Sequence, residues 1–311
     1  MKKRCKKLLP NVPMIVASSR PEWLQKRSQG IGASDAATVL GASPWSDPLT
    51  LFLEKVGLKP GAEENESMRW GQRLQPIVAE EHQLVTGRPI TDPSEGGKFV
   101  IHQHPQIPWC LSTLDYLQED KERGLGVLEI KTTSAFKEED WIEEPPLHYQ
   151  VQVQHQLAVT GLSWGSLSVL IGGQKFITFD IERDEEFIEL MLAHEETFWK
   201  GVLANEAPPP NGSESAAYAL ELLYPKHKEG VVVPLPHEAL ETDERLSQIK
   251  ESIKQLETEE RELKAQIKSW IGDAERGALP GNKGFWDWKV VEKKAYEVKA
   301  SSSRQLRRVK K

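Results

Sequence analysis

Hydrophobic and polar positions follow two different periods along this chain. Between residues 20 and 205, stretches with an apolar residue at every third or fourth position are interspersed with stretches in which every second residue is apolar. The first period is typical of amphipathic helices and the second of half-buried strands. Their mixture predicts one α/β or α+β domain of roughly 200 residues.

Two predicted helices carry polar residues of interest. The stretch "SMRWGQRLQPIVAEEHQLVTG" predicts a helix that ends at Gly87, and "PPLHYQVQVQHQLAVTG" predicts one that begins after two prolines and ends at Gly161. In the second helix, Tyr149, Gln152 and Gln156 fall on one face, an unusually polar line for a helix that must also bury apolar residues. Such amides can bond a metal-bound water and a phosphate or base edge, or form a simple polar surface stripe.

The stretch "STLDYLQEDKERGLGVLEIKTT", residues 112–133, predicts a β-hairpin. If its turn is centred on Glu122, antiparallel pairing places Asp115 directly opposite Glu129. Side chains alternate between the two faces of a strand, so Glu129 and Lys131 share one face, about 6.6 Å apart. Directly opposed residues have Cβ atoms roughly 4.5 to 5.5 Å apart. The sequence therefore predicts two carboxylates in close contact with an ammonium group beside them.

This arrangement has a specific chemistry. Two carboxylates at that distance repel unless a cation lies between them, and Mg²⁺ is a hard ion that takes oxygen ligands and keeps several waters. Lys131 can orient a metal-bound water, or accept its proton if burial and the ion's charge lower the lysine pKa. The group points to metal-assisted hydrolysis of a phosphodiester. The pattern is weak by itself, because it recurs at Asp243 with residues 262–264 and at Asp287 with residues 297–299.

A second candidate site lies in "SQGIGASDAATVLGASPW", residues 28–45. Gly30 and Gly32 precede Ser34, which is a credible N-cap for a short helix, and a helix N-terminus behind a glycine-rich approach can bind an anion. Arg27 can grip the same phosphate. The alternative is a capped surface helix with no ligand.

Composition changes sharply beyond residue 205. Three prolines followed by Asn, Gly and Ser in "EAPPPNGSESAAY" predict the start of a linker. From Glu241 to Trp270, apolar residues occupy a and d heptad positions, which predicts a coiled-coil-like helix that either pairs with a partner helix or docks on its own chain. The stretch "GNKGFWDWKVVEKKAYEVKAS", residues 281–301, alternates like a hairpin. The expected parts are a basic arm over 1–19, a core domain over 20–205, a linker over 206–236 and a helical and hairpin extension over 237–311.

Charge and cysteine content narrow the function classes. The 311 residues carry 40 Lys and Arg against 47 Asp and Glu, a formal net charge of −7. That balance argues against a protein that coats nucleic acid but permits an enzyme with a local basic groove. The basic residues near both ends are either phosphate-binding arms or solvated tails. Because the sequence has no signal-peptide core and no apolar run long enough to span a membrane, we expect a cytoplasmic protein. Cys5 and Cys110 fit reduced thiols.

Four of these stretches, in chain order, resemble the lambda exonuclease and YqaJ-type viral recombinase family of the PD-(D/E)xK nuclease superfamily. They are "GIGASDAATVLGASPW", "WGQRLQPIVAEE", "STLDYL…LEIKTT" and "YQVQVQHQLAVTG", and "IERDEEF" at residues 181–187 is a further match. The resemblance covers about residues 20 to 203. It implies a restriction-endonuclease-like core with a mixed central sheet flanked by helices, and one or two Mg²⁺ ions, with Mn²⁺ as an alternative.

The resemblance also implies roles for single residues. The metal ligands would be Asp115, Glu129 and the backbone carbonyl of Ile130, and Lys131 and Gln152 would act beside them in catalysis. Contacts to DNA and its terminal 5′ phosphate would come from Arg27, Ser34, Tyr149 and Gln154. Gln75 stands behind the metal where the family usually has a glutamate. An amide can hydrogen-bond a metal-bound water but cannot attract the ion by charge, so occupancy of a second metal would be weaker.

The activity so implied is 5′ to 3′ degradation of one strand of linear duplex DNA, which leaves a 3′ overhang for a single-strand annealing protein of a phage recombination pair. The protein would be encoded by a phage or prophage and act in the bacterial cytoplasm. The lambda enzyme is a ring trimer, so a homo-oligomer is a further expectation. Two other interpretations stay open. One is a DNA-end binding or scaffold protein with a weakened nuclease site, and the other is an endonuclease of the same superfamily.

Overall fold

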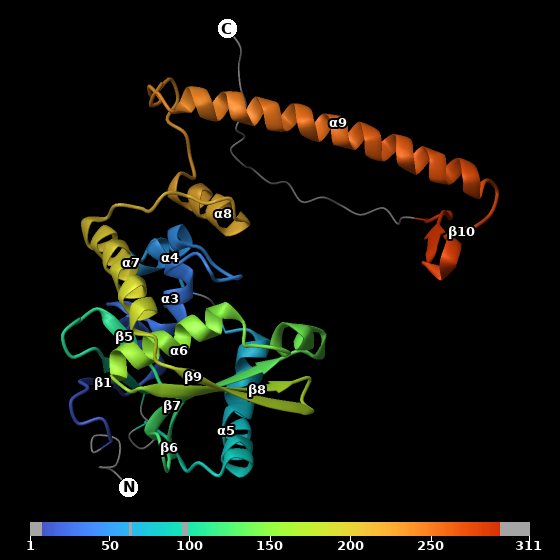
Figure 1. Ribbon diagram of the computed structural model, residues 1–311. Coiled ribbons are helices and arrows are strands. Elements are labelled where there is room, and N and C mark those ends of the chain that lie inside the picture. The colour runs from blue at the N-terminus through green and yellow to red at the C-terminus, as the bar shows by residue number, and fades with distance from the viewer. Residues whose placement is uncertain (1–7, 62–63, 95–98, 293–311) are drawn as a thin grey trace. The chain divides into compact units, whose positions relative to one another are not determined.

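The computed structural model describes residues 8–61, 64–94 and 99–292. The chain divides into two units, the first ending at Pro225 and the second beginning at Lys226 (Figure 1). The first unit is a mixed α/β structure with two sheets, and it contains all of the candidate site residues. The expected fold class, a mixed sheet flanked by helices, is therefore confirmed.

A five-stranded mixed sheet forms the centre of the first unit. Its strand order is β3-β6-β7-β8-β9, in which β7 and β8 are parallel and every other neighbouring pair is antiparallel. The strands are β3 (Ile90–Thr91), β6 (Tyr116–Asp120), β7 (Gly124–Thr133), β8 (Trp164–Ile171) and β9 (Lys175–Glu182). Because β7 lies in the middle of this order, it is paired on both edges and its side chains are covered on both faces.

Helices cover both faces of this sheet. Those of the first unit are α2 (Arg20–Arg27), α3 (Ala33–Val39), α4 (Pro48–Lys55), α5 (Glu66–Thr86), α6 (Leu147–Thr160), α7 (Glu185–Ala204) and α8 (Glu214–Leu223), with the 3₁₀ helix η1 at Ala135–Trp141. Gly87 and Gly161 end α5 and α6 in the left-handed conformation, as their positions predict.

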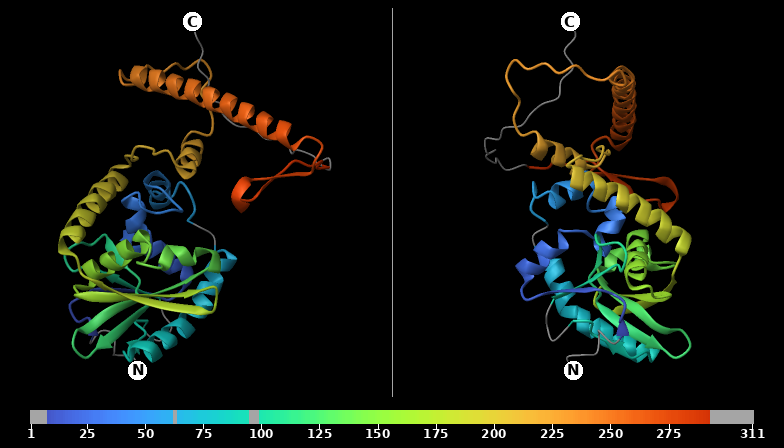
Figure 2. Two further views of the ribbon diagram at one scale, coloured as in Figure 1. Left: turned by 45° about the vertical axis from the view of Figure 1, so that its right-hand side comes forward. Right: turned by 90° about the vertical axis from the view of Figure 1, so that its left-hand side faces the viewer.

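The alternation of β7 decides which helix meets which residue. Val127 packs in one core with Val153 of α6, whereas Leu128 packs on the other face with Val78 of α5. The two helices thus lie on opposite faces of the sheet (Figures 1 and 2). Glu129 has the same parity as Val127, so it points toward α6 and the polar face of that helix.

A second, four-stranded sheet is formed by strands that precede β6 in the chain. It has the order β1-β4-β5-β2, with β2 and β5 parallel. Its strands are β1 (Met14–Ala17), β2 (Ile31–Gly32), β4 (Phe99–Gln103) and β5 (Cys110–Ser112). Only residues 113–115 separate β5 from β6, so Asp115 lies at the junction of the two sheets, close to the start of α3 that follows β2.

The predicted segment boundaries need correction at two places. β1 lies within residues 1–19, where a basic arm is predicted, and pairs with β4 from Met14 to Ala17. α8 lies within residues 206–236, where a linker is predicted, and buries Ala219 in a cluster that includes residues of α4, while Ala216 is buried as well. Both segments are short and have charged or proline-rich neighbours in the chain, but Ala17 of β1 and the two alanines of α8 are buried.

The second unit consists of one long helix and a small hairpin. Its elements are α9 (Ala239–Ile271), β10 (Arg276–Ala278), η2 (Pro280–Asn282) and β11 (Phe285–Asp287). The heptad residues of α9 are exposed, for example Leu256 at 65% and Trp270 at 72%. The hairpin begins before residue 281, and residues 293–301 of the predicted hairpin lie outside the described residues. No helix among the described residues is long and apolar enough to cross a membrane.

Candidate active site

Asp115 and Glu129 come together through the β6–β7 hairpin. Tyr116 pairs with Leu128 and Asp120 with Gly124, which is the predicted register centred on Glu122. Asp115 is the residue just before β6, and its Oδ2 accepts a hydrogen bond of 2.9 Å from the backbone N–H of Ile130. The predicted hairpin and its register are therefore confirmed, and the two carboxylates meet at the open end of the hairpin.

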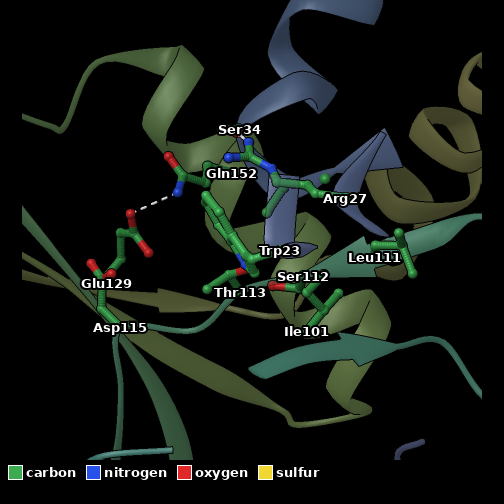
Figure 3. Close-up of a pocket in the computed structure, with 12 residues that line it drawn as sticks. Trp23, Arg27, Ser34, Ile101, Leu111, Ser112, Thr113, Asp115, Glu129 and Gln152 are labelled. Atoms are coloured by element: carbon green, nitrogen blue, oxygen red, sulfur yellow. Dashed lines mark hydrogen bonds between the residues drawn. The ribbon is translucent and has the colours of Figure 1, made fainter. Parts of the chain in front are cut away.

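Glu129 is held by three side chains. Its Oε1 accepts hydrogen bonds of 2.6 Å from Lys131 Nζ and from Gln152 Nε2, and its Oε2 accepts one of 2.6 Å from Gln156 Nε2. Lys131 Nζ also donates to Gln152 Oε1 at 3.0 Å. Glu129 is only 3% exposed, so these donors replace the water that a charged carboxylate needs. Figure 3 shows Gln152 reaching toward Glu129, with Asp115 alongside.

Asp115 is less well compensated than Glu129. Burial, and then the negative charge of Glu129, raise the pKa of Asp115 to about 8, although Lys131, the Ile130 N–H and a hydrogen bond from Gln75 act in the opposite direction. Gln75 lines the groove over this carboxylate, and its place behind a bound metal stays a prediction. Burial alone would lower the pKa of Lys131, but Glu129 and Asp115 outweigh it and raise that pKa, which keeps the lysine an ammonium.

This donor set fits a hard divalent cation. Asp115 and Glu129 offer carboxylate oxygens, and a cation between them would relieve the repulsion that raises the Asp115 pKa. In a strand, the N–H and C=O of one residue point to the same edge. Because the Ile130 N–H bonds Asp115, the Ile130 carbonyl lies on the same edge and can supply a third oxygen.

A cavity of about 200 Å³ connects the carboxylates to Arg27 and Ser34 (Figure 3). An Arg27 nitrogen bonds Ser34 Oγ, and the guanidinium also lies 3.7 Å from Asp35. A Cβ on Gly32 would lie 3.2 Å from Arg27 Nε, so glycine leaves room for the arginine. Arg27 and Ser34 thus lie together in one cavity with Asp115 and Glu129, and their binding of a phosphate stays a prediction.

Ser34 is, however, not the N-cap of α3. Gly32 holds that position, and its backbone N–H donates to the Asp35 carboxylate at 3.0 Å. Lys55 pairs with the same carboxylate at 2.7 Å. Since Asp35 takes over the capping interaction, the hydroxyl of Ser34 is left to bond Arg27.

A larger groove of about 790 Å³ opens over the same carboxylates. Lys131, Tyr149 and Gln75 line it, together with Trp45 from the loop between α3 and α4. Lys131 Nζ lies 4.9 Å from the centre of the Tyr149 ring, and that ring stacks on Trp141 at 5.3 Å. Tyr149 therefore lies beside Lys131, and its contact with DNA stays a prediction.

Gln154 does not belong to this site. The prediction that it contacts DNA is contradicted, because it is buried and both ends of its amide bond the backbone elsewhere: Nε2 donates to Glu182 O at 2.7 Å, and Oε1 accepts from Asp184 N at 3.1 Å. Two residues along a helix correspond to about 200° of rotation, so Gln152 and Gln154 face opposite ways. Gln154 ties α6 to the start of α7.

Three residues at the site were not assigned a role from the sequence. Gln156 contacts Glu129 directly, and its place on the polar line of α6 was a signal for this. Thr113 lines the smaller cavity and accepts a hydrogen bond of 3.3 Å from Trp23 Nε1. Trp45 lies in the quoted stretch that ends "GASPW", but nothing in that pattern shows that the tryptophan faces the groove.

Cys110, His155 and Glu195 form a second buried group, in which His155 comes from α6. His155 Nδ1 lies 2.8 Å from Glu195 Oε1, and Nε2 lies 2.9 Å from Leu111 O and 3.6 Å from Cys110 Sγ. The three side chains could surround a metal ion, but both ring nitrogens already face hydrogen-bond acceptors. We interpret the group as a buried ion pair that joins α6, α7 and β5.

Comparison with known proteins agrees with this geometry. Residues 22–163 match the model of the YqaJ-like viral recombinase domain. The chain is 36% identical over 289 residues to the uncharacterized protein YqaJ of Bacillus subtilis, a match that covers 91% of this chain and 87% of that protein.

Solved structures give the same fold. The alkaline exonuclease LHK-Exo from Laribacter hongkongensis matches with a TM-score of 0.50 and 23% identity, over 60% of this chain and 94% of that one. The structure of LHK-Exo in complex with dAMP matches to the same extent. Together with the match to YqaJ over nearly the whole length, this shows that the chain belongs to the YqaJ-like viral recombinase family.

Proposed function

We propose that this protein is a Mg²⁺-dependent DNA exonuclease that degrades the 5′ strand of linear duplex DNA from 5′ to 3′, leaving a 3′ overhang for an annealing protein. One observation carries the proposal. A buried carboxylate pair with an adjacent ammonium, formed by Asp115, Glu129 and Lys131, shares a cavity with the Arg27 and Ser34 side chains. The fold shared with an alkaline exonuclease supports it.

The residues around the pair suit phosphodiester hydrolysis. Mg²⁺ held by Asp115, Glu129 and the Ile130 carbonyl would polarise the phosphodiester and lower the pKa of a bound water. Gln156 and Gln152 fix the orientation of Glu129 through its two oxygens. With both carboxylate oxygens held, Glu129 presents its charge in one direction, which is what a preorganised site requires.

Lys131 would act as a hydrogen-bond donor in this site. The neighbouring carboxylates raise its pKa, so it carries a proton that it can share with a phosphate oxygen or the attacking water. Gln152 Oε1 accepts from the same ammonium at 3.0 Å and holds it beside Glu129. The alternative that Lys131 takes a proton from the water would require its pKa to fall.

Arg27 and Ser34 would bind the 5′ phosphate of the DNA end. A guanidinium and a hydroxyl directed into one cavity are typical phosphate donors. The same cavity reaches Asp115 and Glu129, so an anchored terminal phosphate would lie close to the first phosphodiester of the strand. This arrangement favours an exonuclease that starts at an end over an endonuclease.

The test is time-resolved digestion of a linear duplex labelled at one 5′ end, with and without Mg²⁺. We expect degradation only with the metal, release of the 5′ label first, and slower digestion of an end that carries a 5′ hydroxyl. Equal rates on 5′ hydroxyl and 5′ phosphate ends would remove the role of Arg27 and Ser34. Cleavage of closed circular DNA would replace the exonuclease by an endonuclease.

Absence of turnover in Mg²⁺ and Mn²⁺, together with tight binding to DNA ends, would favour a DNA-end binding or scaffold protein. Glu129→Gln serves as the matched control for hydrolysis, because it keeps the shape of the side chain and removes the charge. We expect Glu129→Gln to bind DNA ends and to degrade none.

A further inference from the structure

Trp45 is an exposed tryptophan at the edge of the candidate active site. It lies in the loop between α3 and α4, is 68% exposed and lines the same groove as Lys131 and Tyr149. Single apolar residues on a surface need no explanation by themselves. A tryptophan that stands in the groove over a buried carboxylate pair is a different case, because a substrate that occupies this groove lies beside it.

The loop that carries Trp45 is fixed at both of its ends. On one side, the backbone N–H groups of Ala42 and Ser43 donate to Ala37 O at 2.8 and 3.1 Å. On the other, Asp47 caps α4 by accepting hydrogen bonds from the backbone N–H groups of Leu49 and Thr50. The indole is therefore presented to solvent by an ordered backbone, which lowers the entropy lost when a ligand stacks on it.

Trp45 is part of an aromatic group that reaches the catalytic lysine. Its ring centre lies 4.6 Å from that of His148, with the rings at 84°, and 5.9 Å from that of Tyr149. Lys131 Nζ in turn lies 4.9 Å from the Tyr149 ring centre. His148 Nε2 is buried beside this group and has no hydrogen-bond partner among the described residues. The group thus combines the exposed ring of Trp45 with a buried His148 nitrogen that has no hydrogen-bond partner among the described residues.

We propose that Trp45 is a stacking platform for a nucleobase of the DNA strand that is degraded. The proposal rests on the nuclease function proposed above and adds a base-binding position to it. Aromatic side chains bind single-stranded bases of any sequence, because every base offers a π-face. Successive bases lie about 3.4 Å apart along a strand. Even at this duplex spacing, the ring distances from Trp45 through Tyr149 to Lys131 place the stacked base at most about three nucleotides from the phosphate being cleaved, and an extended strand would need fewer.

A base can reach Trp45 only if it has left the duplex. Stacking on the indole would compensate for part of the lost pairing and stacking within the DNA. Trp45 would then hold the end of the strand open while the phosphodiester lies at Asp115 and Glu129. This role depends on the ring and not on a charge, so phenylalanine should replace tryptophan in part, whereas alanine should not.

The test uses 5′-phosphorylated duplexes with a single abasic residue at the first, second, third or fourth position of the degraded strand. Affinity is measured with Ca²⁺ in place of Mg²⁺, so that binding is read apart from cleavage, for the full chain, Trp45→Ala and Trp45→Phe. Tyr218→Ala is the matched control, since Tyr218 is also an exposed aromatic residue of the first unit, at 55%, but lines neither cavity.

We expect one of the first three abasic positions to weaken binding of the unmodified chain by about 5- to 150-fold. Trp45→Ala should bind the intact duplex with the same reduced affinity, and the abasic residue should not reduce its affinity further. In Trp45→Phe and Tyr218→Ala, the abasic residue should still weaken binding. A penalty of equal size in Trp45→Ala, or unchanged affinity of Trp45→Ala for the intact duplex, would overturn the proposal. A penalty that depends on Trp45 in a protein without Mg²⁺-dependent cleavage would support the platform while refuting the nuclease function.

Discussion

Replacement of Gln156 by leucine tests whether the α6 amides hold Glu129 in place. Gln156 Nε2 donates to Glu129 Oε2 at 2.6 Å, and the glutamine is 1% exposed. Leucine has a similar size and no polar atoms, so the change removes the donor without opening the core. Glu129 Oε2 then lacks its only donor among the described residues, while Oε1 keeps Lys131 and Gln152.

The size of the effect follows from two opposing contributions. A hydrogen bond to a charged group contributes about 1.5 to 3 kcal/mol to the free energy of unfolding. Gln156 Oε1 is itself buried without a partner, and its removal returns about 1 kcal/mol. We therefore expect Gln156→Leu to lower the stability of the metal-free protein by about 0.5 to 2 kcal/mol. Because Glu129 also loses its fixed orientation, the Mg²⁺ concentration for half-maximal DNA degradation should rise.

Urea unfolding without divalent ions measures the first effect, and digestion of linear duplex over a Mg²⁺ series measures the second. Gln150→Leu is the control, because Gln150 lies on the same helix and donates to Pro145 O, a neutral acceptor. The control should lose stability with no change in Mg²⁺ dependence. If Gln156→Leu unfolds at the urea concentration of the unmodified chain and needs no more Mg²⁺, the amide does not hold the carboxylate.

Three further variants test Lys131 and Gln75 at the candidate active site and His155 in the second buried group. Lys131→Met should slow DNA degradation by about 10²- to 10⁴-fold in single-turnover assays while DNA-end binding persists, because it removes the proton donor beside Glu129; turnover at the normal rate would refute that role. Gln75→Glu should lower the Mg²⁺ concentration for half-maximal activity by about tenfold, a gain of about 1.4 kcal/mol in metal binding, since it adds a carboxylate beside Asp115; an unchanged or higher requirement would contradict this. Burial opposes protonation of His155, but Cys110 and then Glu195 outweigh it and raise the His155 pKa well above 6.5. The stability that protonated His155 contributes should therefore be complete below about pH 6.5 and lost as the pH rises through the raised pKa. Urea unfolding of the unmodified chain and of His155→Leu over a pH series should show their difference shrinking with rising pH, and a constant difference would exclude a charged His155.

The hairpin is the part of the site that local sequence could predict. Period-two alternation and a charged turn determine the register of β6 and β7, and the register alone brings Asp115 to Glu129. The alternation and the turn depend only on residues within about twenty positions of one another in the chain. The same reasoning placed Glu129 and Lys131 on one face, and the structure joins them at 2.6 Å.

The orientation of α6 could not be predicted in this way. Glutamines occur on opposite sides of the helix, and composition does not tell which side meets the carboxylate. Contacts with the sheet determine the orientation of the helix. Gln154 donates to the backbone carbonyl of Glu182 at the end of β9, and Gln156 donates to Glu129 on β7. α8 was missed for a related reason, since its alanines become core residues only when α4 lies against them.

Charge balance around the carboxylate pair explains why Gln75→Glu should lower, and not raise, the Mg²⁺ concentration needed for activity. Glu129 has an ammonium and two amide donors, whereas Asp115 has a backbone N–H, so Asp115 is the less compensated carboxylate and its pKa rises to about 8. A Mg²⁺ ion that displaces its proton would meet two carboxylates and one ammonium, which carry one net negative charge, and the ion would reverse that charge. A second divalent ion would meet a positive site until a DNA phosphate brings its own charge. A glutamate at position 75 would supply that charge in advance. With glutamine there, a second ion would have to be taken up together with the DNA.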